Sequence, residues 1–159
     1  MTRLTPLHLA LEYTMRLSIK MALLLVFVPL VASAQFKDLD VAMSNLKRGF
    51  SSGDPQAIVS GMAAGDKVML QFPGLIDLKT EFFGRDQASY LLDGLFTKVH
   101  PTAFEEQSAK KKSADAQYNI TATWTIQNAG KPETRELYIT LHQTADSQWS
   151  VVSIRSAGK

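Results

Sequence analysis

Four side chains of this sequence are of types that could act as an acid or a base in a reaction: Asp77, Glu81, His100 and His142. Such chemistry needs a carboxyl or imidazole group whose pKa is tuned by an apolar wall. Asp77 interrupts an apolar segment, and His142 lies in an alternating, strand-like segment, so these two are the catalytic candidates. The alternatives are a carboxylate at a sheet edge or rim for Asp77 and a polar or interface residue for His142. His100 precedes a proline at the end of a predicted helix, where capping accounts for it.

The sequence predicts no metal site and no cofactor. The chain has three histidines and no cysteine. Neither His100 nor His142 belongs to a short ligand motif, such as two histidines on one turn of a helix. Because disulfides cannot form without cysteine, the fold must depend on its hydrophobic core.

Aromatic side chains are the candidates for lining a ligand pocket, namely Tyr90, Phe96, Tyr118 and Trp124. In an enzyme, Tyr90, Tyr118 or Tyr138 could also donate a hydrogen bond to the substrate. For Phe96 and Trp124 the spacing is also typical of plain core packing, which is the alternative for these two residues.

The first 34 residues are typical of a secretory signal peptide. Basic residues precede the apolar run 21–31, and Ala32-Ser33-Ala34 supplies small residues at the cleavage positions. We therefore expect cleavage after Ala34 and export to the periplasm or the medium. Met15 begins a complete leader of its own, so we expect translation to start there rather than at residue 1. The alternative is a retained membrane anchor, but the run is shorter than the roughly 20 residues that cross a bilayer.

Removal of this leader leaves a chain without net charge. Residues 1–34 contain three of the 17 basic residues and one of the 15 acidic residues, which leaves 14 of each. A neutral protein has no net field to attract nucleic acid or an anionic membrane, so we expect neither as a partner. Lys110-Lys111-Lys112 is a short basic cluster, and its flanking residues predict a solvated turn between two strands.

The hydrophobic pattern of residues 35–159 is helical first and strand-like afterwards, which predicts a single α+β domain. Apolar residues at three- and four-residue steps predict helices over 36–50 and 86–99. Between them, Asp54 and Pro55 have the residue types of a helix N-cap and a first helical position. A short second helix is therefore predicted after Asp54.

Strands are predicted for most of the remaining chain. Two apolar segments that flank a Pro-Gly turn predict a hairpin over 67–83. Residues 117–127 alternate between apolar and polar without interruption, and 134–143 and 149–155 follow after turn-forming residues. These three segments predict an antiparallel meander. Trp124 lies on the apolar face of its strand, whereas His142 lies on the polar face.

This order of elements resembles the nuclear transport factor 2-like fold, a cystatin-like α+β cone. The resemblance is carried by three segments: Gly53-Asp54-Pro55, Gly84-Arg85-Asp86-Gln87-Ala88 and Trp149-Ser150-Val151-Val152. Within this fold, the chain is most similar to an uncharacterised family of small exported bacterial proteins, a domain of unknown function. The resemblance implies three N-terminal helices packed on a curved antiparallel sheet, which forms a cone with a pocket at its open end.

Two functions of different class follow from these observations. The first is an exported, non-catalytic domain that binds a small apolar ligand in the cone or a protein partner through the sheet. The alternative is an enzyme of the ketosteroid isomerase or dehydratase kind, with Asp77 or His142 as the base on the inward face of the sheet. The resemblance also implies a homodimer through the outer face of the sheet, which carries Thr121, Thr123, Thr125, Tyr138 and Thr140.

Overall fold

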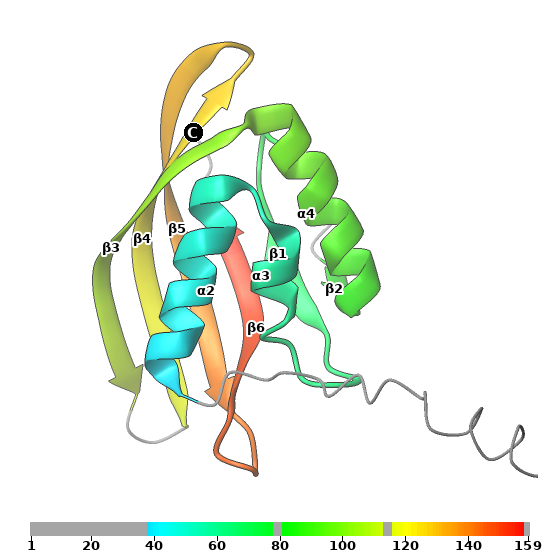
Figure 1. The fold of residues 1–159 in the computed structure, drawn as a ribbon, viewed down its shortest axis with the longest axis vertical. Helices are drawn as coiled ribbons and strands as arrows, with labels where there is room; N and C mark the ends of the chain where they lie inside the picture. The colour runs from blue at the N-terminus through cyan, green and yellow to red at the C-terminus, as the bar shows by residue number, and fades with distance from the viewer. Residues whose placement is uncertain (1–37, 78–80, 113–115, 158–159) are drawn as a thin grey trace, which may run out of the picture. The chain divides into compact units, whose positions relative to one another are not determined.

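The structure, a computed structural model, describes residues 38–77, 81–112 and 116–157 (Figure 1). The predicted signal peptide, residues 1–34, lies outside the described residues. The elements in chain order are α2 (Leu39–Ser52), α3 (Pro55–Val59), β1 (Val68–Gln71), β2 (Glu81–Phe83), α4 (Arg85–Val99), β3 (Pro101–Lys112), β4 (Gln117–Asn128), β5 (Lys131–Gln143) and β6 (Trp149–Ser156). None of the described helices has the length and apolar character needed to cross a membrane.

The strands form one sheet in the order β2-β1-β6-β5-β4-β3. Figure 1 shows the three helices on one side of this sheet, with the long strands bending around them. This arrangement confirms the predicted α+β class. One detail differs, because β1 and β6 pair in parallel, whereas the prediction was an antiparallel sheet throughout. The two strands are far apart in the sequence, and no local pattern indicates which strand will lie beside β1.

The two short-range helix signals at the start of the domain are confirmed. The side chain of Asp54 accepts hydrogen bonds from the backbone N–H groups of Gln56 and Ala57, and Pro55 occupies the first position of α3. Gly53, which ends α2, has a φ of 68°, a conformation that favours glycine. The two helices therefore turn sharply within three residues, which places α3 beside α2.

Helix α4 agrees with its prediction almost residue for residue. Its inward face buries Ala88, Leu92, Leu95, Phe96 and Val99. His100 ends the helix with a φ of 42° and donates its backbone N–H to the carbonyl oxygen of Phe96. The capping role of His100 is thus a backbone role. A proline follows at the start of β3, so the helix cannot continue.

The predicted hairpin over 67–83 is only partly correct. β1 and β2 do pair in antiparallel, with Val68 opposite Phe83 and Leu70 opposite Glu81. Pro73 and Gly74 form the predicted tight turn, in which the N–H of Leu75 donates to the carbonyl oxygen of Phe72 at 3.1 Å and Gly74 has a φ of 74°. However, β2 has three residues, so this turn lies in a longer loop and does not join the two strands directly. Leu75 in this loop is buried, because the loop folds inward over the core. Asp77 is therefore an exposed loop residue and does not interrupt a strand.

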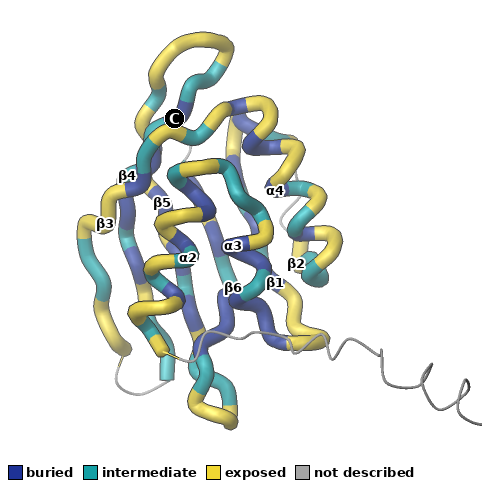
Figure 2. Tube along the Cα trace, viewed as in Figure 1, coloured by how far each residue is buried: buried dark blue, intermediate teal, exposed yellow. Residues whose placement is uncertain are grey.

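The meander of β4, β5 and β6 contains the most regular pairing in the sheet. Figure 2 shows buried residues at intervals along these strands. On β4, Ile120, Ala122, Trp124 and Ile126 are all buried, as the alternation predicts. Ala129 and Gly130 join β4 to β5 in a two-residue turn, and both have positive φ values, of 50° and 75°.

The lysine cluster is not in a turn. Lys110, Lys111 and Lys112 end the edge strand β3 and pair with Asn119, Tyr118 and Gln117 of β4. Their long side chains are exposed. The strand pairs through backbone hydrogen bonds, which polar side chains do not prevent. The predicted solvated turn is thus wrong in its structure, although the three side chains are solvated.

Two glycines inside helices differ in the space around them, and they give a matched test of the helix packing. A Cβ at Gly49 of α2 would lie 2.4 Å from Cγ1 of buried Ile58, whereas a Cβ at Gly94 of α4 would meet nothing within 4 Å. Gly49→Ala should lower the free energy of unfolding by about 1–3 kcal/mol through overpacking. Gly94→Ala should raise it by about 0.5–1 kcal/mol, because alanine is the better helix former.

Denaturant titration of the two variants and of the parent protein measures both differences. Effects of the same sign at the two positions would contradict the described packing of α2 against α3.

Candidate functional site

The interior of the cone, where a ligand pocket was expected, is filled by aromatic side chains. Trp124 is 0% exposed, and its ring lies 5.5 Å from that of Phe50 and 6.1 Å from those of Phe72 and Phe96, between centroids. The Phe50 ring also stacks on Phe104, with centroids 5.7 Å apart. These five rings come from α2, α4, β3, β4 and the end of β1, so every layer of the domain contributes to the filling.

The indole N–H of Trp124, the polar group of this ring cluster, has a hydrogen-bond partner within the cluster. The Trp124 indole Nε1–H donates to the carbonyl oxygen of Phe50 at 2.9 Å. A buried indole N–H without a partner would destabilise the fold by about 1–3 kcal/mol. The bond therefore fixes the orientation of the Trp124 ring and connects the sheet to the end of α2.

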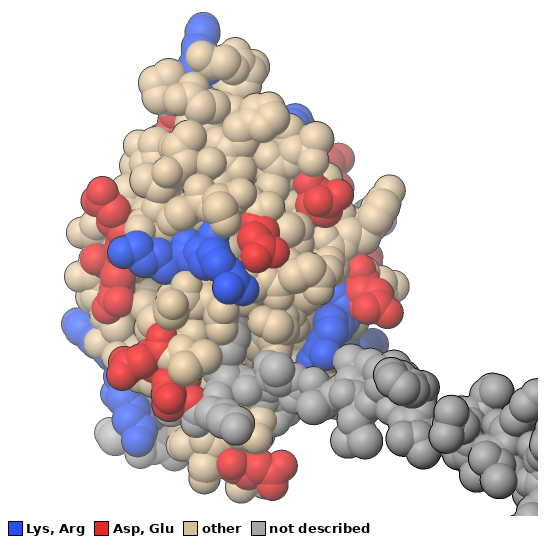
Figure 3. Space-filling view, in the orientation of Figure 1, with Lys and Arg blue, Asp and Glu red and all other residues tan. Residues whose placement is uncertain are grey.

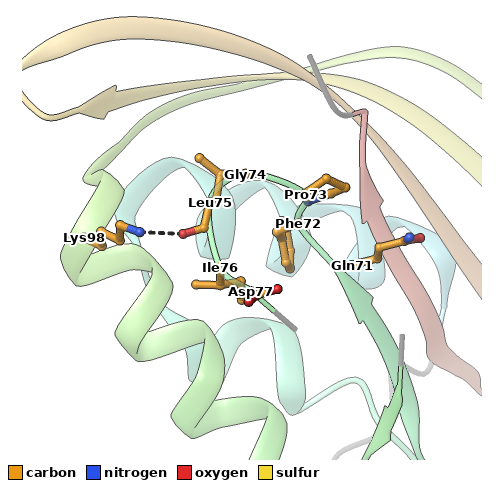
Figure 4. A pocket seen from close by; sticks show the side chains of 8 residues that line it. All are labelled: Gln71, Phe72, Pro73, Gly74, Leu75, Ile76, Asp77 and Lys98. Atoms are coloured by element: carbon orange, nitrogen blue, oxygen red, sulfur yellow. Dashed lines mark hydrogen bonds between the residues drawn. The ribbon is translucent and has the colours of Figure 1, made fainter. Parts of the chain in front are cut away.

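The mouth of the cone is closed by the loop after β1, residues 72–77. Two cationic side chains hold this loop by its backbone. Lys98 of α4 donates through Nζ to the carbonyl oxygen of Leu75 at 2.7 Å, a contact that Figure 4 shows. Arg135 of β5 donates through Nη1 to the carbonyl oxygen of Pro73, also at 2.7 Å. The loop is thus fastened to both the helix layer and the sheet.

Arg135, which holds the loop after β1, was not among the residues singled out from the sequence. It is buried, and both Nε and Nη2 lie 2.8 Å from Oε1 of Glu133. Asn128 donates to the other oxygen of Glu133 at 3.0 Å. A buried guanidinium is tolerated only when it is paired and hydrogen-bonded, and this one is. Arg135 shares its strand face with Leu137, so the alternation of β5 already indicated an inward position.

An open hollow of about 550 Å³ lies outside the closed mouth (Figure 4). Its lining consists of Gln71, Phe72, Pro73, Gly74, Leu75, Ile76, Asp77 and Lys98. Asp77, a predicted catalytic candidate, is therefore at this hollow, but as an exposed side chain on the loop.

The other acid–base candidates lie elsewhere. His142 is exposed and lies opposite Gln117, on the outer face of the sheet. Glu81 is exposed on the short strand β2, and His100 ends α4. The structure thus does not bring Asp77 and His142 to one site. In the part of the chain that the structure describes, no group of three or more His, Cys, Asp or Glu side chains could hold a metal ion.

The four pocket candidates separate in the same way. Phe96 and Trp124 do meet, but as members of the packed interior. Tyr118 lies against Trp149, with ring centroids 6.0 Å apart. Tyr90 is 79% exposed on the surface of α4. Core packing therefore accounts for Phe96 and Trp124, and neither lines an open cavity among the described residues.

The described helices lie on one side of the sheet and leave its outer face uncovered (Figure 1). It carries the five residues that the sequence analysis assigned to it, of which Tyr138 is 39% exposed. The Tyr138 hydroxyl donates to Oε2 of Glu136 at 2.6 Å, and this hydrogen bond raises the pKa of Tyr138 above its ordinary value. Across the strands, Thr140 bonds Asn119 at 3.2 Å. Over β4 and β5 this face carries polar side chains and the ring of Tyr138, and at the far edge of the sheet Phe82 of β2 is 62% exposed opposite Met69.

The helix side of the domain has no comparable uniform surface. Figure 3, which views that side, shows Lys and Arg side chains interspersed with Asp and Glu. Arg48, for example, lies 3.4 Å from Asp54. An interspersed surface of this kind gives no directed field toward a polyanion.

The comparisons with known proteins find likenesses of structure but not of sequence. No family model matches the chain, and no curated protein matches it. A DUF4783 family protein from Bacteroides ovatus is 19% identical, with a TM-score of 0.58 over 73% of this chain and 96% of that one. Its counterpart from Bacteroides uniformis is 15% identical, with a TM-score of 0.60 over 73% and 95%.

A ketosteroid isomerase-like protein from Erwinia carotovora is 18% identical, with a TM-score of 0.56 over 84% of this chain and 100% of that one. At such identities these likenesses establish the fold alone. They confirm the resemblance drawn from the sequence. The chain has the nuclear transport factor 2-like fold, which it shares with proteins of the DUF4783 family and with ketosteroid isomerase-like proteins.

Proposed function

We propose that this protein is a non-catalytic binding module, exported from the cell, that binds a protein partner through the outer face of its sheet. The observation that carries the proposal is the filling of the cone. Phe50 and Trp124 are 0% exposed and fill the space between the helices and the sheet. Close-packed interiors leave no room for a molecule of substrate size.

The alternative, an enzyme of the ketosteroid isomerase or dehydratase kind, finds little support. Such an enzyme needs its base on the inward face with Trp124, but His142 faces outward and Asp77 lies on the loop outside the mouth. The buried charges, Arg135 and Glu133, are engaged with each other and with the backbone. A side chain already committed in this way is not available to move a proton.

The outer face supports the binding of a protein for two reasons. It is long, because β4 pairs with β5 over all 12 of its residues. It also presents Tyr138, an aromatic with a polar end, of the type that is enriched at protein interfaces. Because the hydroxyl of Tyr138 is bonded to Glu136, less side-chain entropy would be lost when a partner packs on its ring.

A photo-crosslinking phenylalanine analogue at position 138 tests the outer face directly. In the cells that produce the protein, we expect a crosslinked product of defined mass from position 138, and none from the same analogue at position 90. Tyr90 is the matched control, because it is the more exposed of the two tyrosines but lies on α4. A product of twice the mass of the chain would identify a face-to-face homodimer, and another defined mass a different protein. Equal labelling at both positions would contradict the proposal.

A second candidate function is the binding of a small ligand in the hollow outside the mouth. The specific observation in its favour is that Lys98 and half-buried Ile76 line the same hollow, so a ligand with an anionic end and an apolar body would find both partners. Native mass spectrometry of protein purified without denaturation would then show a mass excess that denaturation removes. The excess should fall in Lys98→Met and persist in Lys47→Met, which removes an exposed cation of α2. A mass without excess would contradict this candidate.

The proposed export is tested separately, because cleavage after Ala34 would give a mature chain of known mass. We expect the denatured mass of the protein purified from the periplasm or medium to equal that of residues 35–159. Replacing the small residue before the cleavage site, Ala34→Leu, should leave a longer species in the membrane fraction. A full-length species in the cytoplasm would contradict the proposed export.

A further inference from the structure

The strand β3 is a long sheet edge. It has 12 residues and pairs with β4 along one side. In the described part of the chain, no strand pairs with its other side. An unpaired edge presents backbone N–H and C=O groups that can pair with another strand. β3 is therefore a place where the sheet could be extended by a second chain.

The charges along this edge are arranged in two blocks. Glu105 and Glu106 precede Ser108, and the lysine cluster Lys110–Lys112 follows it. The side chains of both blocks are exposed. No described residue forms an ion pair with Glu105, Glu106 or Lys110. An acidic block followed by a basic block is complementary to itself when the second copy runs in the opposite direction.

A bulge in β3 brings the two blocks into register. Glu106 lies opposite Ala122 and Ser108 lies opposite Thr121, so Gln107 has no residue opposite to it on β4. Counted along the paired strand, Glu105 is therefore two positions before Ser108 and Lys110 is two positions after it. Both lie on the outer face of the sheet, opposite Thr123 and Asn119.

We propose that β3 pairs in antiparallel with β3 of a second copy of this chain, about a twofold axis beside Ser108. Glu105 then lies opposite Lys110 of the second copy, and Lys110 lies opposite Glu105 of the second copy. The two contacts are identical, as twofold symmetry requires. Glu106 lies diagonally across from Lys111 of the second copy, on the inner face. Opposite charges directly across an antiparallel pair stabilise it, and like charges destabilise it.

The alternative arrangements of two β3 strands lack this complementarity. Parallel pairing in register would place glutamate beside glutamate and lysine beside lysine. Exposed lysines and bulges also occur on edges that remain unpaired, which they protect from association. Variants that exchange the charges of β3 therefore distinguish a paired edge from a protected one.

This inference rests on the proposed function in one respect, because it names a second copy of the chain as a partner of the sheet. Its test is independent. Sedimentation velocity over a concentration series, on protein expressed from the full-length sequence, should show a monomer–dimer equilibrium that weakens at high salt. Glu105→Lys alone and Lys110→Glu alone should each raise the dissociation constant at least about tenfold.

Mixing the two single variants is the decisive experiment. In a mixed dimer of Glu105→Lys with Lys110→Glu, each contact again joins opposite charges, so the mixture should dimerise about as tightly as the parent, although each variant alone dimerises more weakly. The double variant Glu105→Lys/Lys110→Glu should dimerise like the parent protein. Exchange of the backbone amides of β3 should slow with dimer formation, while that of β2, the opposite edge, should not change.

Three results would overturn the β3 pairing: a monomeric parent protein, single variants that dimerise as tightly as the parent, or a mixture that dimerises no more tightly than the single variants. A monomer would show that the lysines and the bulge protect the edge. None of these results bears on the outer face, because Tyr138 lies on β5, and its crosslinks report on the proposed function separately.

Discussion

The hydrogen bond from the Trp124 indole to the Phe50 carbonyl is the interaction on which the rest of this structure depends. It fixes the largest buried side chain of the sheet against the end of α2, at 2.9 Å. The rings of Phe72 and Phe96 then pack around Trp124 and bring in the end of β1 and helix α4. Once these rings occupy the centre of the cone, any binding function must belong to the surface of the domain. The contact between Trp124 and Phe50 thus accounts for the filled interior, and the filled interior is the reason for proposing that partners bind on the sheet surface.

The closed mouth follows from a second constraint, the burial of Arg135. A buried guanidinium is costly unless its donors are satisfied, and here they bind Glu133, the Pro73 carbonyl and, at 3.4 Å, the Ala157 carbonyl. Opening the loop would remove the Pro73 acceptor and leave a buried donor unsatisfied. Lys98 adds a second fastening from the helix side, at Leu75. The loop therefore closes the cone as part of the folded structure, and both fastenings oppose the entry of a ligand.

The local features of this domain were predictable from the sequence, and the non-local ones were not. The cap at Asp54, the inward face of α4 and the alternation of β4 each depend on residues within one element, and all three are confirmed. The parallel pairing of β1 with β6 depends on a partner far away in the chain. The strand at Lys110–Lys112 pairs with residues 117–119, which are near in the sequence, but three successive lysines lack the alternation that predicts a strand. The apolar pattern of 75–83 likewise did not indicate the shortness of β2. For the site, the alternation of β5 already placed Arg135 inward. The spacing of Phe96 and Trp124 fits a packed core as well as a pocket, so only their distances decide between the two.

The exchange of the Trp124 indole proton with solvent, followed by NMR, tests the central claim most directly. The signal can be told from that of Trp149 with a Trp149→Phe variant. If the interior is filled and closed, this proton exchanges only when the whole domain unfolds, at the rate of the slowest amides of β4. Exchange much faster than that, with the β4 amides still protected, would mean that the cone opens to solvent. It would contradict the closed interior and favour a ligand in the cone.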